Sequence, residues 1–275
     1  MTATPLTLPG HRAFSSLVRG EPLFAATGVL VALSLLVTVP AMLIDPRLFQ
    51  GESVWVKPIK FQVALAIYLL TLAIFARWLP AGMIGKKSYR IFAAAVVFAV
   101  IAELVWIGGA AMYAIASHYN QSEPLMVTLY PLMGVLATLL TSASLVHGIA
   151  IWRNPRTGLP PALHLSIALG LVLTFALTVP VAGFISGMPG HHVGEAAAGE
   201  GLPVFGWSRE VGDLRVAHFL ATHALHVLPL LGLLLSRLVR ERLARAGVWA
   251  GAAALAALVV LTLAQALMGR PLMPL

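Results

Sequence analysis

The feature that most constrains this chain is the recurrence of apolar runs of about 20 residues along its length. A helix of that length crosses the hydrocarbon core of a bilayer, which is roughly 30 Å thick. Only 10% of the 275 residues are charged, too few for the surface of a soluble domain of this size. The sequence therefore predicts an all-α polytopic membrane protein, folded over residues 1–275 as a single domain of seven transmembrane helices. The expected spans are residues 23–44, 58–79, 91–115, 125–152, 161–186, 214–237 and 247–268.

The distribution of positive charge predicts the orientation of these helices. Most of the 18 Lys and Arg residues lie in the N-terminal segment and in the second, fourth and sixth connecting loops. The positive-inside rule then puts the N-terminus in the cytoplasm and the C-terminus outside. The net charge of +8 is explained by this topology, so we expect the lipid bilayer as partner and no nucleic acid. The predicted location is the bacterial inner membrane, as a multi-pass protein.

One apolar stretch, GDLRVAHFLATHALHVLPLLG at 212–232, contains an arginine and three histidines. On a helix, Arg215, His218 and His226 follow one stripe, and His223 lies on its flank. Ionisable residues are expensive within a membrane and usually mark functional sites in the bundle interior. Histidine can also join helices by hydrogen bonds, but three histidines with an arginine favour a functional site.

A carboxylate is predicted at a similar membrane depth. Glu103, in AVIAELVWIGGAAMY, lies about as far below the outer surface as His223 and His226. A carboxylate at that depth must be protonated, paired with a cation or bound to metal. Imidazole and carboxylate groups together suit iron, copper or zinc. The predicted metal ligands are His118, His218, His223 and His226, with Glu103 as a catalytic residue.

Cationic and polar groups are expected nearer the outer surface. Lys57 and Lys60 belong to WVKPIKF, Asn120 belongs to SHYN, and Arg215 opens the sixth span. The two lysines could instead reach to the membrane interface. Together with helix N-termini, these groups would attract a carboxylate, a phosphate or a haem propionate. We therefore expect Lys57 and Lys60 to bind a cofactor or ligand, and Arg215 and Asn120 to act in catalysis.

A second histidine pair is predicted near the inner surface. His147 and His164 flank the short loop 153–160 and could face each other across a helical hairpin. Paired imidazoles from two helices are one way in which bundles hold a b-type haem. The alternative is that these two residues only pack. His191 and His192, in an outer loop, could bind metal but are more often simply solvated.

Several chemistries are excluded or left without support. The chain has no cysteine, which rules out disulfides and thiolate ligands. It contains no HExxH, GxSxG, P-loop or dinucleotide-binding glycine motif. The motifs WVKPIKF, SHYN and GWSREVGDLRVAHFLATH resemble those of a group of bacterial multi-pass membrane proteins, from about residue 50 to 232. That resemblance implies a membrane protein of the same kind and implies no particular activity.

Three functional hypotheses follow from the sequence. The first is a membrane-embedded metal- or haem-dependent oxidoreductase whose site opens to the periplasm and accepts a lipid-like, quinone-like or small anionic ligand. The second is a b-type haem electron-transfer subunit. The third is a proton-coupled transporter or ion pathway, in which the titratable residues form a relay. A purely structural subunit would use none of these titratable residues for an activity. A second copy of the chain or a redox partner could complete any of these assemblies.

Overall fold

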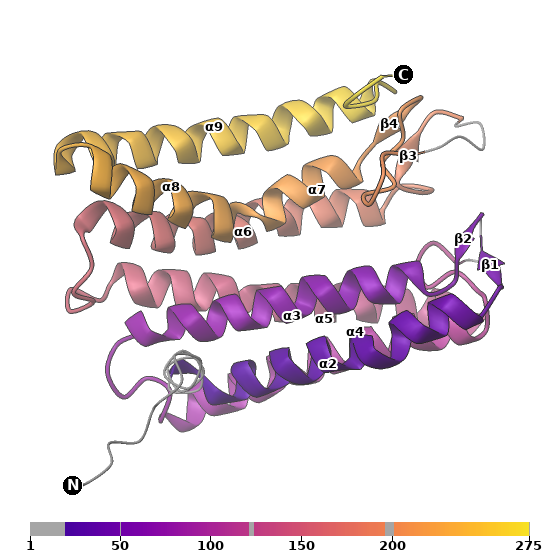
Figure 1. Ribbon diagram of the computed structural model, residues 1–275, viewed down its shortest axis with the longest axis horizontal. Helices are drawn as coiled ribbons and strands as arrows, with labels where there is room; N and C mark the ends of the chain where they lie inside the picture. The colour runs from indigo at the N-terminus through magenta and orange to yellow at the C-terminus, as the bar shows by residue number, and fades with distance from the viewer. Residues whose placement is uncertain (1–19, 50, 121–123, 196–200, 275) are drawn as a thin grey trace, which may run out of the picture. The chain divides into compact units, whose positions relative to one another are not determined.

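The computed structural model describes residues 20–49, 51–120, 124–195 and 201–274 (Figure 1). The fold is mainly helical, as predicted, with only two short two-stranded sheets among the described residues. The chain divides into two compact units, Met1–Ser117 and His118–Leu275. We describe each unit by itself.

The described part of the first unit contains three long helices. They are α2 (Pro22–Ile44), α3 (Val56–Phe75), which continues into the short 3-10 helix η1 (Ala76–Trp78), and α4 (Lys87–Met112). The hairpin of β1 (Leu48–Phe49) and β2 (Glu52–Ser53) joins α2 to α3. Thr38 donates to the Gln62 side chain, whose amide donates to Ser34, at 2.7 and 2.8 Å, so polar side chains join α2 to α3.

The second unit is built around α6. Its helices are α5 (Pro124–Trp152), α6 (Pro161–Ser186), α7 (Arg215–Thr222), α8 (Ala224–Leu238) and α9 (Glu241–Leu267). Helix α6 packs against all four of the others. An antiparallel pair of strands, β3 (His192–Val193) and β4 (Gly212–Asp213), lies in the connection from α6 to α7. This pair and the C-terminal end of α9 lie at the same end of the unit (Figure 1).

Within the described residues, six helices are long and apolar enough to cross a membrane: α2, α3 with η1, α4, α5, α6 and α9. Helices α7 and α8 pass the same test only together, as a pair bent by 48°. Large apolar side chains such as Leu36 and Val260 are 72% and 61% exposed, as expected of surfaces that face lipid. These features indicate a multi-pass membrane protein, with six candidate spans in the part of the chain that the structure describes, or seven if the bent pair is one span.

Small residues allow the helices of the second unit to approach closely. The buried cluster between α6, α8 and α9 is rich in alanine, and it includes Ala162, Ala224 and Ala244. A Cβ atom on Gly232 would lie only 2.0 Å from the Ser166 hydroxyl oxygen, so α8 contacts α6 through bare backbone there. Membrane helices associate in this way because lipid supplies no hydrophobic force between them. The same contact positions the histidine-rich segment against α6.

Candidate functional site

The histidine-rich segment does not form the continuous helix expected over 214–237. Helix α7 ends at Thr222, α8 begins at Ala224, and His223 between them has backbone angles outside the helical range. After the break, the N–H of His226 donates to the His223 carbonyl, three residues back, at 2.9 Å. Pro229 lacks an N–H and disturbs the preceding turn of α8. His223 therefore occupies a break in a helix that is otherwise apolar enough to span.

Helix α6 supplies the hydrogen bond that the break removes from the backbone. The Leu225 N–H would donate to Ala221 in a regular helix, and it donates instead to the Thr174 hydroxyl at 2.9 Å. The same hydroxyl donates to the Gly170 carbonyl at 2.9 Å. A Cβ atom on Gly170 would lie 2.8 Å from the Ala224 carbonyl oxygen. Gly170 thus lets the backbone at the break approach α6, and Thr174, one turn later, binds the N–H group that the break leaves without a partner.

The imidazole of His223 is oriented by the backbone of its own helix. Its Nδ1 lies 2.8 Å from the Phe219 carbonyl oxygen, which can only accept, so Nδ1 carries the proton. The ring stacks on Phe219, with centroids 3.9 Å apart. In the neutral imidazole Nε2 then carries the lone pair, and it has no hydrogen bond to another described residue. A histidine held in this way is set up to bind a metal or to accept a proton through Nε2.

Aromatic rings continue outward from His223 toward the connection between α6 and α7. Phe219 lies 5.3 Å from both Phe205 and Trp207, measured between ring centroids. In the other direction along the chain, the ring of His226 lies 5.5 Å from that of His223. The break is therefore bordered by two imidazoles on one side and three aromatic rings on the other.

Two buried polar atoms of α6 and α7 have no hydrogen-bond partner among the described residues. They are the Thr178 hydroxyl oxygen, one turn after Thr174, and Nδ1 of His218. Buried polar atoms are nearly always satisfied in proteins, so each such atom calls for a water, an ion or a ligand.

Arg215 forms an ion pair with the neighbouring carboxylate of Asp213. Its guanidinium donates to both oxygens of Asp213, at distances of 2.6 to 3.2 Å, and to the Gly206 carbonyl at 2.6 Å. Asp213 is fully buried and also accepts the backbone N–H groups of Ser208 and Arg215. Burial raises the pKa of Asp213, but the hydrogen bonds from His192 and Arg215 outweigh it and hold the pKa well below its usual range. Arg215 therefore orders the connection between α6 and α7.

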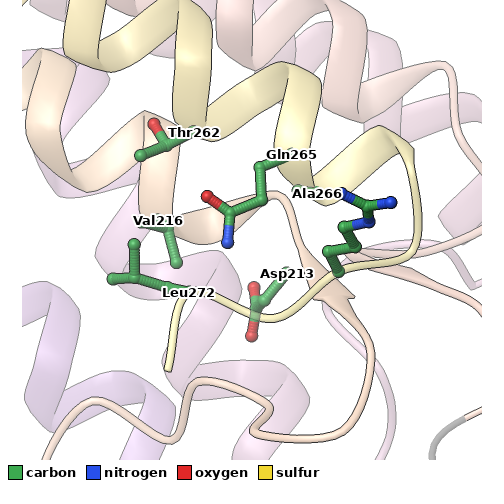
Figure 2. Close-up of a pocket in the computed structure, with 7 residues that line it drawn as sticks. Asp213, Val216, Thr262, Gln265, Ala266 and Leu272 are labelled. Carbon is green, nitrogen blue, oxygen red and sulfur yellow. The ribbon is translucent and has the colours of Figure 1, made fainter. Parts of the chain in front are cut away.

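The residues that follow α9 cover this ion pair. Figure 2 shows Asp213 and Val216 facing Thr262 and Gln265 of α9, with Leu272 closing the same space. The Gln265 side chain donates to the Pro271 carbonyl at 2.6 Å, which holds the segment after α9 in place. The enclosed space leaves no room for a water molecule. This end of the second unit is consequently packed, and Asp213 acts there as a structural anion.

His192, which the sequence left as a solvated residue, belongs to the same cluster. It pairs with Asp213 across strands β3 and β4, and its Nε2 lies 3.5 Å from the Asp213 carboxylate. Its ring lies 4.2 Å from that of His191. The sequence carried no signal for this contact, because the two partners are 21 residues apart (213 − 192 = 21) in a loop without periodicity.

Glu103 and the two lysines belong to the first unit. Glu103 is only 4% exposed, and its Oε1 atom has no hydrogen bond to any described residue. Lys57, in the first turn of α3, is close enough to act on it electrostatically, whereas Lys60 is exposed. The nearby Trp106 donates its indole N–H to the Ser117 carbonyl at 2.8 Å. A functional pairing of Glu103 with the histidines stays a prediction.

His118 and Asn120 begin the second unit. The His118 ring lies 5.7 Å from that of Tyr130, edge to face. Tyr119, which lies between His118 and Asn120 in the sequence, donates its hydroxyl to the Ile185 carbonyl of α6 at 3.2 Å. Burial raises the pKa of this phenol. The segment is thus attached to α6, and the roles of His118 as a ligand and of Asn120 in catalysis stay predictions.

His147 and His164, the pair predicted near the inner surface, lie in α5 and α6. His147 is fully buried in α5. His164 donates through Nε2 to the Ile151 carbonyl at 2.7 Å. That carbonyl belongs to the last turn of α5, and it also accepts the backbone N–H of Asn154 at 2.9 Å. His164 therefore joins α6 to the end of α5, which is the packing alternative, and only its Nδ1 remains for a ligand.

The residues that the structure brings together are thus His223, His226 and Phe219, with Arg215 further along the same connection. Within the described parts of the chain, no group of three or more His, Asp or Glu side chains is arranged to hold a metal ion. No protein-family model, curated protein or solved structure matches this chain.

Proposed function

We propose that this protein is a membrane-embedded metal- or haem-dependent oxidoreductase whose metal is bound at the break between α7 and α8. His223 and His226 are the proposed protein ligands. The observation that carries the proposal is the bond from His223 Nδ1 to the Phe219 carbonyl. Metal-binding histidines almost always donate their second ring nitrogen to a carbonyl or carboxylate, which fixes the tautomer and orients the lone pair.

The ligand set also bears on which metal would be bound. Two imidazoles from neighbouring turns leave coordination positions to be completed by water, by substrate or by a porphyrin. A haem iron needs only one or two protein ligands, and non-haem iron, copper or zinc accept imidazole with additional oxygen ligands. The proposed cofactor is therefore haem b or a single transition metal ion. Glu103 remains the proposed catalytic carboxylate.

The surroundings of the break favour a flat or apolar substrate. Phe219, Trp207 and Phe205 present aromatic surface between the break and the connection that follows α6. Aromatic rings stack well on quinone-like head groups, and lipid-exposed helices give such molecules access from the bilayer. The proposed substrate is a quinone-like or lipid-like molecule, and Lys57 and Lys60 would attract an anionic group. The proposed membrane is the bacterial inner membrane, with the N-terminus inside.

The proposal is tested by metal analysis of variants purified in detergent. Wild type, His223→Gln, His226→Gln and His164→Gln are compared by elemental analysis and optical spectrum, and helix content is checked by circular dichroism. We expect wild type and His164→Gln to contain stoichiometric metal and both break variants to lose most of it. A Soret band identifies haem, and metal without one identifies a non-haem centre.

Two results would reject the proposal. Loss of a Soret band in His147→Gln and His164→Gln, with His223→Gln unchanged, would support the rival haem pair near the loop 153–160. Wild-type protein that carries no metal or chromophore, when expressed in metal-replete cells, would reject the oxidoreductase function altogether.

A second candidate, a proton-coupled transporter or ion pathway, is favoured by the break itself. Non-helical backbone at membrane depth occurs where it is buried or lines a cavity, and transporters place their binding sites at such breaks. His223 and His226 would then exchange protons. Proton flux into proteoliposomes that is abolished by His223→Gln, in protein without bound metal, would favour this function over the first.

A further inference from the structure

A cavity of about 220 Å³ lies in the first unit, at the turn that joins α3 to α4. It is lined by Gly20, which precedes α2, by Ala76 and Arg77 of η1, and by residues of the turn 79–85. It takes no part in the site proposed above, because it lies at the opposite end of α3 from Lys57. It is large enough for a phosphate group with part of what the phosphate is attached to, and smaller than most pockets for drug-sized ligands.

The ends of the neighbouring membrane-spanning helices put the cavity at the membrane surface. Helix α3 with η1 is long and apolar enough to span as far as Trp78, and the next spanning helix begins at Lys87. The turn between them therefore lies at the depth of the lipid head groups. Lys86 and Lys87 follow the turn and add positive charge beside it. The neighbouring Glu21 does not line the cavity, and its buried carboxylate accepts the Phe24 N–H at 2.5 Å.

Arg77 supplies the one charged side chain among the described residues that line the cavity. The Arg77 guanidinium uses Nε to donate to the Ile74 carbonyl at 2.8 Å, and it lies over the Trp78 ring at 5.4 Å. Its two terminal nitrogens bind no other described residue. In the turn, the backbone N–H groups of Gly82, Ile84 and Gly85 likewise have no acceptor among the described residues. A fixed guanidinium and several unused N–H groups around one space make a binding site for an oxyanion.

We propose that this cavity binds a phosphate group, either that of an anionic phospholipid or a small phosphate anion. Arg77 binds two phosphate oxygens through its terminal nitrogens, and the N–H groups of the turn bind the remaining ones. The geometry of the guanidinium matters because its planar fork matches phosphate better than a lysine ammonium does. A phospholipid seated here would fasten the α3–α4 turn to the membrane surface.

Native mass spectrometry of the whole protein in detergent, titrated with phosphatidylglycerol, tests the proposal. Arg77→Gln removes the proposed ligand, and Arg90→Gln removes the same charge from an exposed position that does not line the cavity. We expect Arg77→Gln to weaken binding of the first phosphatidylglycerol roughly tenfold or more, because a charge-assisted bidentate contact is lost, and Arg90→Gln to leave it nearly unchanged. Phosphatidylcholine serves as the zwitterionic comparison.

The source of the phosphate is distinguished by competition with inorganic phosphate. Displacement of phosphatidylglycerol in wild type, and not in Arg77→Gln, identifies a site that also accepts the small anion. Retention of the lipid identifies a lipid site. Equal weakening in Arg77→Gln and Arg90→Gln, or no weakening in either, overturns the proposal, because binding is then general surface attraction. If Arg77→Gln does not fold, Arg77→Lys replaces it, and binding as tight as in wild type overturns the proposal.

Discussion

Two aspartates in this protein bind an arginine two residues later with nearly the same geometry, but they differ in burial. In each pair the arginine Nε donates to the two carboxylate oxygens at 2.9 and 3.2 Å. The Asp213 side chain is 0% exposed and that of Asp45 is 16% exposed, with Arg215 at 34% and Arg47 at 47%. Trp55 completes the first pair and His192 the second. Because solvent screens exposed charges, the two pairs should differ in their contribution to stability.

We predict that Asp213→Asn destabilises the protein by about 1–3 kcal/mol near neutral pH, a value reduced for the exposure of Arg215. The pKa of Asp213 is lower in the folded state than its unfolded value of about 4, so its stabilisation is present above that pH and is lost as pH falls below it. Thermal unfolding in detergent between roughly pH 3 and pH 7 measures both effects.

Asp45→Asn is the matched control for this prediction. It removes the same contacts from the exposed pair, so we expect a smaller loss of stability than in Asp213→Asn. Equal losses in the two variants, or an acid dependence that Asp213→Asn leaves unchanged, would contradict the role given to the buried pair.

At the level of elements, the break between α7 and α8 is maintained from α6. Thr174→Val keeps the volume of the side chain and removes the hydroxyl that binds the Leu225 N–H. We predict a loss of about 1–3 kcal/mol, the cost of leaving a buried N–H without a partner. Thr262→Val in α9 is the control, since that hydroxyl binds only carbonyls of its own helix. Unfolding in detergent should separate the two variants, and equal effects would contradict the role of Thr174.

Gly170 permits the close approach of α6 to the break. A Cβ atom there would lie 2.8 Å from the Ala224 carbonyl oxygen and 3.0 Å from the Pro229 ring. We predict that Gly170→Ala destabilises the protein by about 1–3 kcal/mol through overpacking. Gly134→Ala in α5, where a Cβ meets nothing within 4 Å, should be neutral or slightly stabilising. A neutral Gly170→Ala, by the same unfolding assay, would mean that the contact with the break is loose.

The elements themselves could largely be predicted from the sequence, and the break could not. Six of the seven expected spans agree with single helices to within six residues at each end, because bilayer thickness and the apolar runs set their lengths. The break depends on a bond between Thr174 and Leu225, which are 51 residues apart, and no local pattern encodes it. Arg215 and the three histidines of 212–232 were found by their cost in a membrane. Which of them orders a loop and which borders the break was decided by contacts between residues far apart in the sequence, such as that of Asp213 with His192.

At the level of the whole molecule, the distribution of Lys and Arg predicts a periplasmic connection between α6 and α7 and a cytoplasmic one between α5 and α6. The chain has no native cysteine, so a maleimide labels only the single cysteine that is introduced. We predict that Glu210→Cys reacts with a membrane-impermeant maleimide in intact cells, whereas Thr157→Cys reacts only after lysis. The reverse pattern would invert the topology, and labelling of both in intact cells would contradict an odd number of crossings between the two positions.

The most direct test of a metal site at the helix break is X-ray absorption at the edge of whichever metal copurifies with the protein. We predict nitrogen neighbours at about 2.0–2.1 Å, the metal–imidazole distance in proteins, with the multiple scattering of imidazole rings. In His223→Gln that imidazole signal should fall or the metal should be absent. A ligand shell that is the same in wild type and His223→Gln, or wild-type protein that carries no metal, would contradict the proposed function.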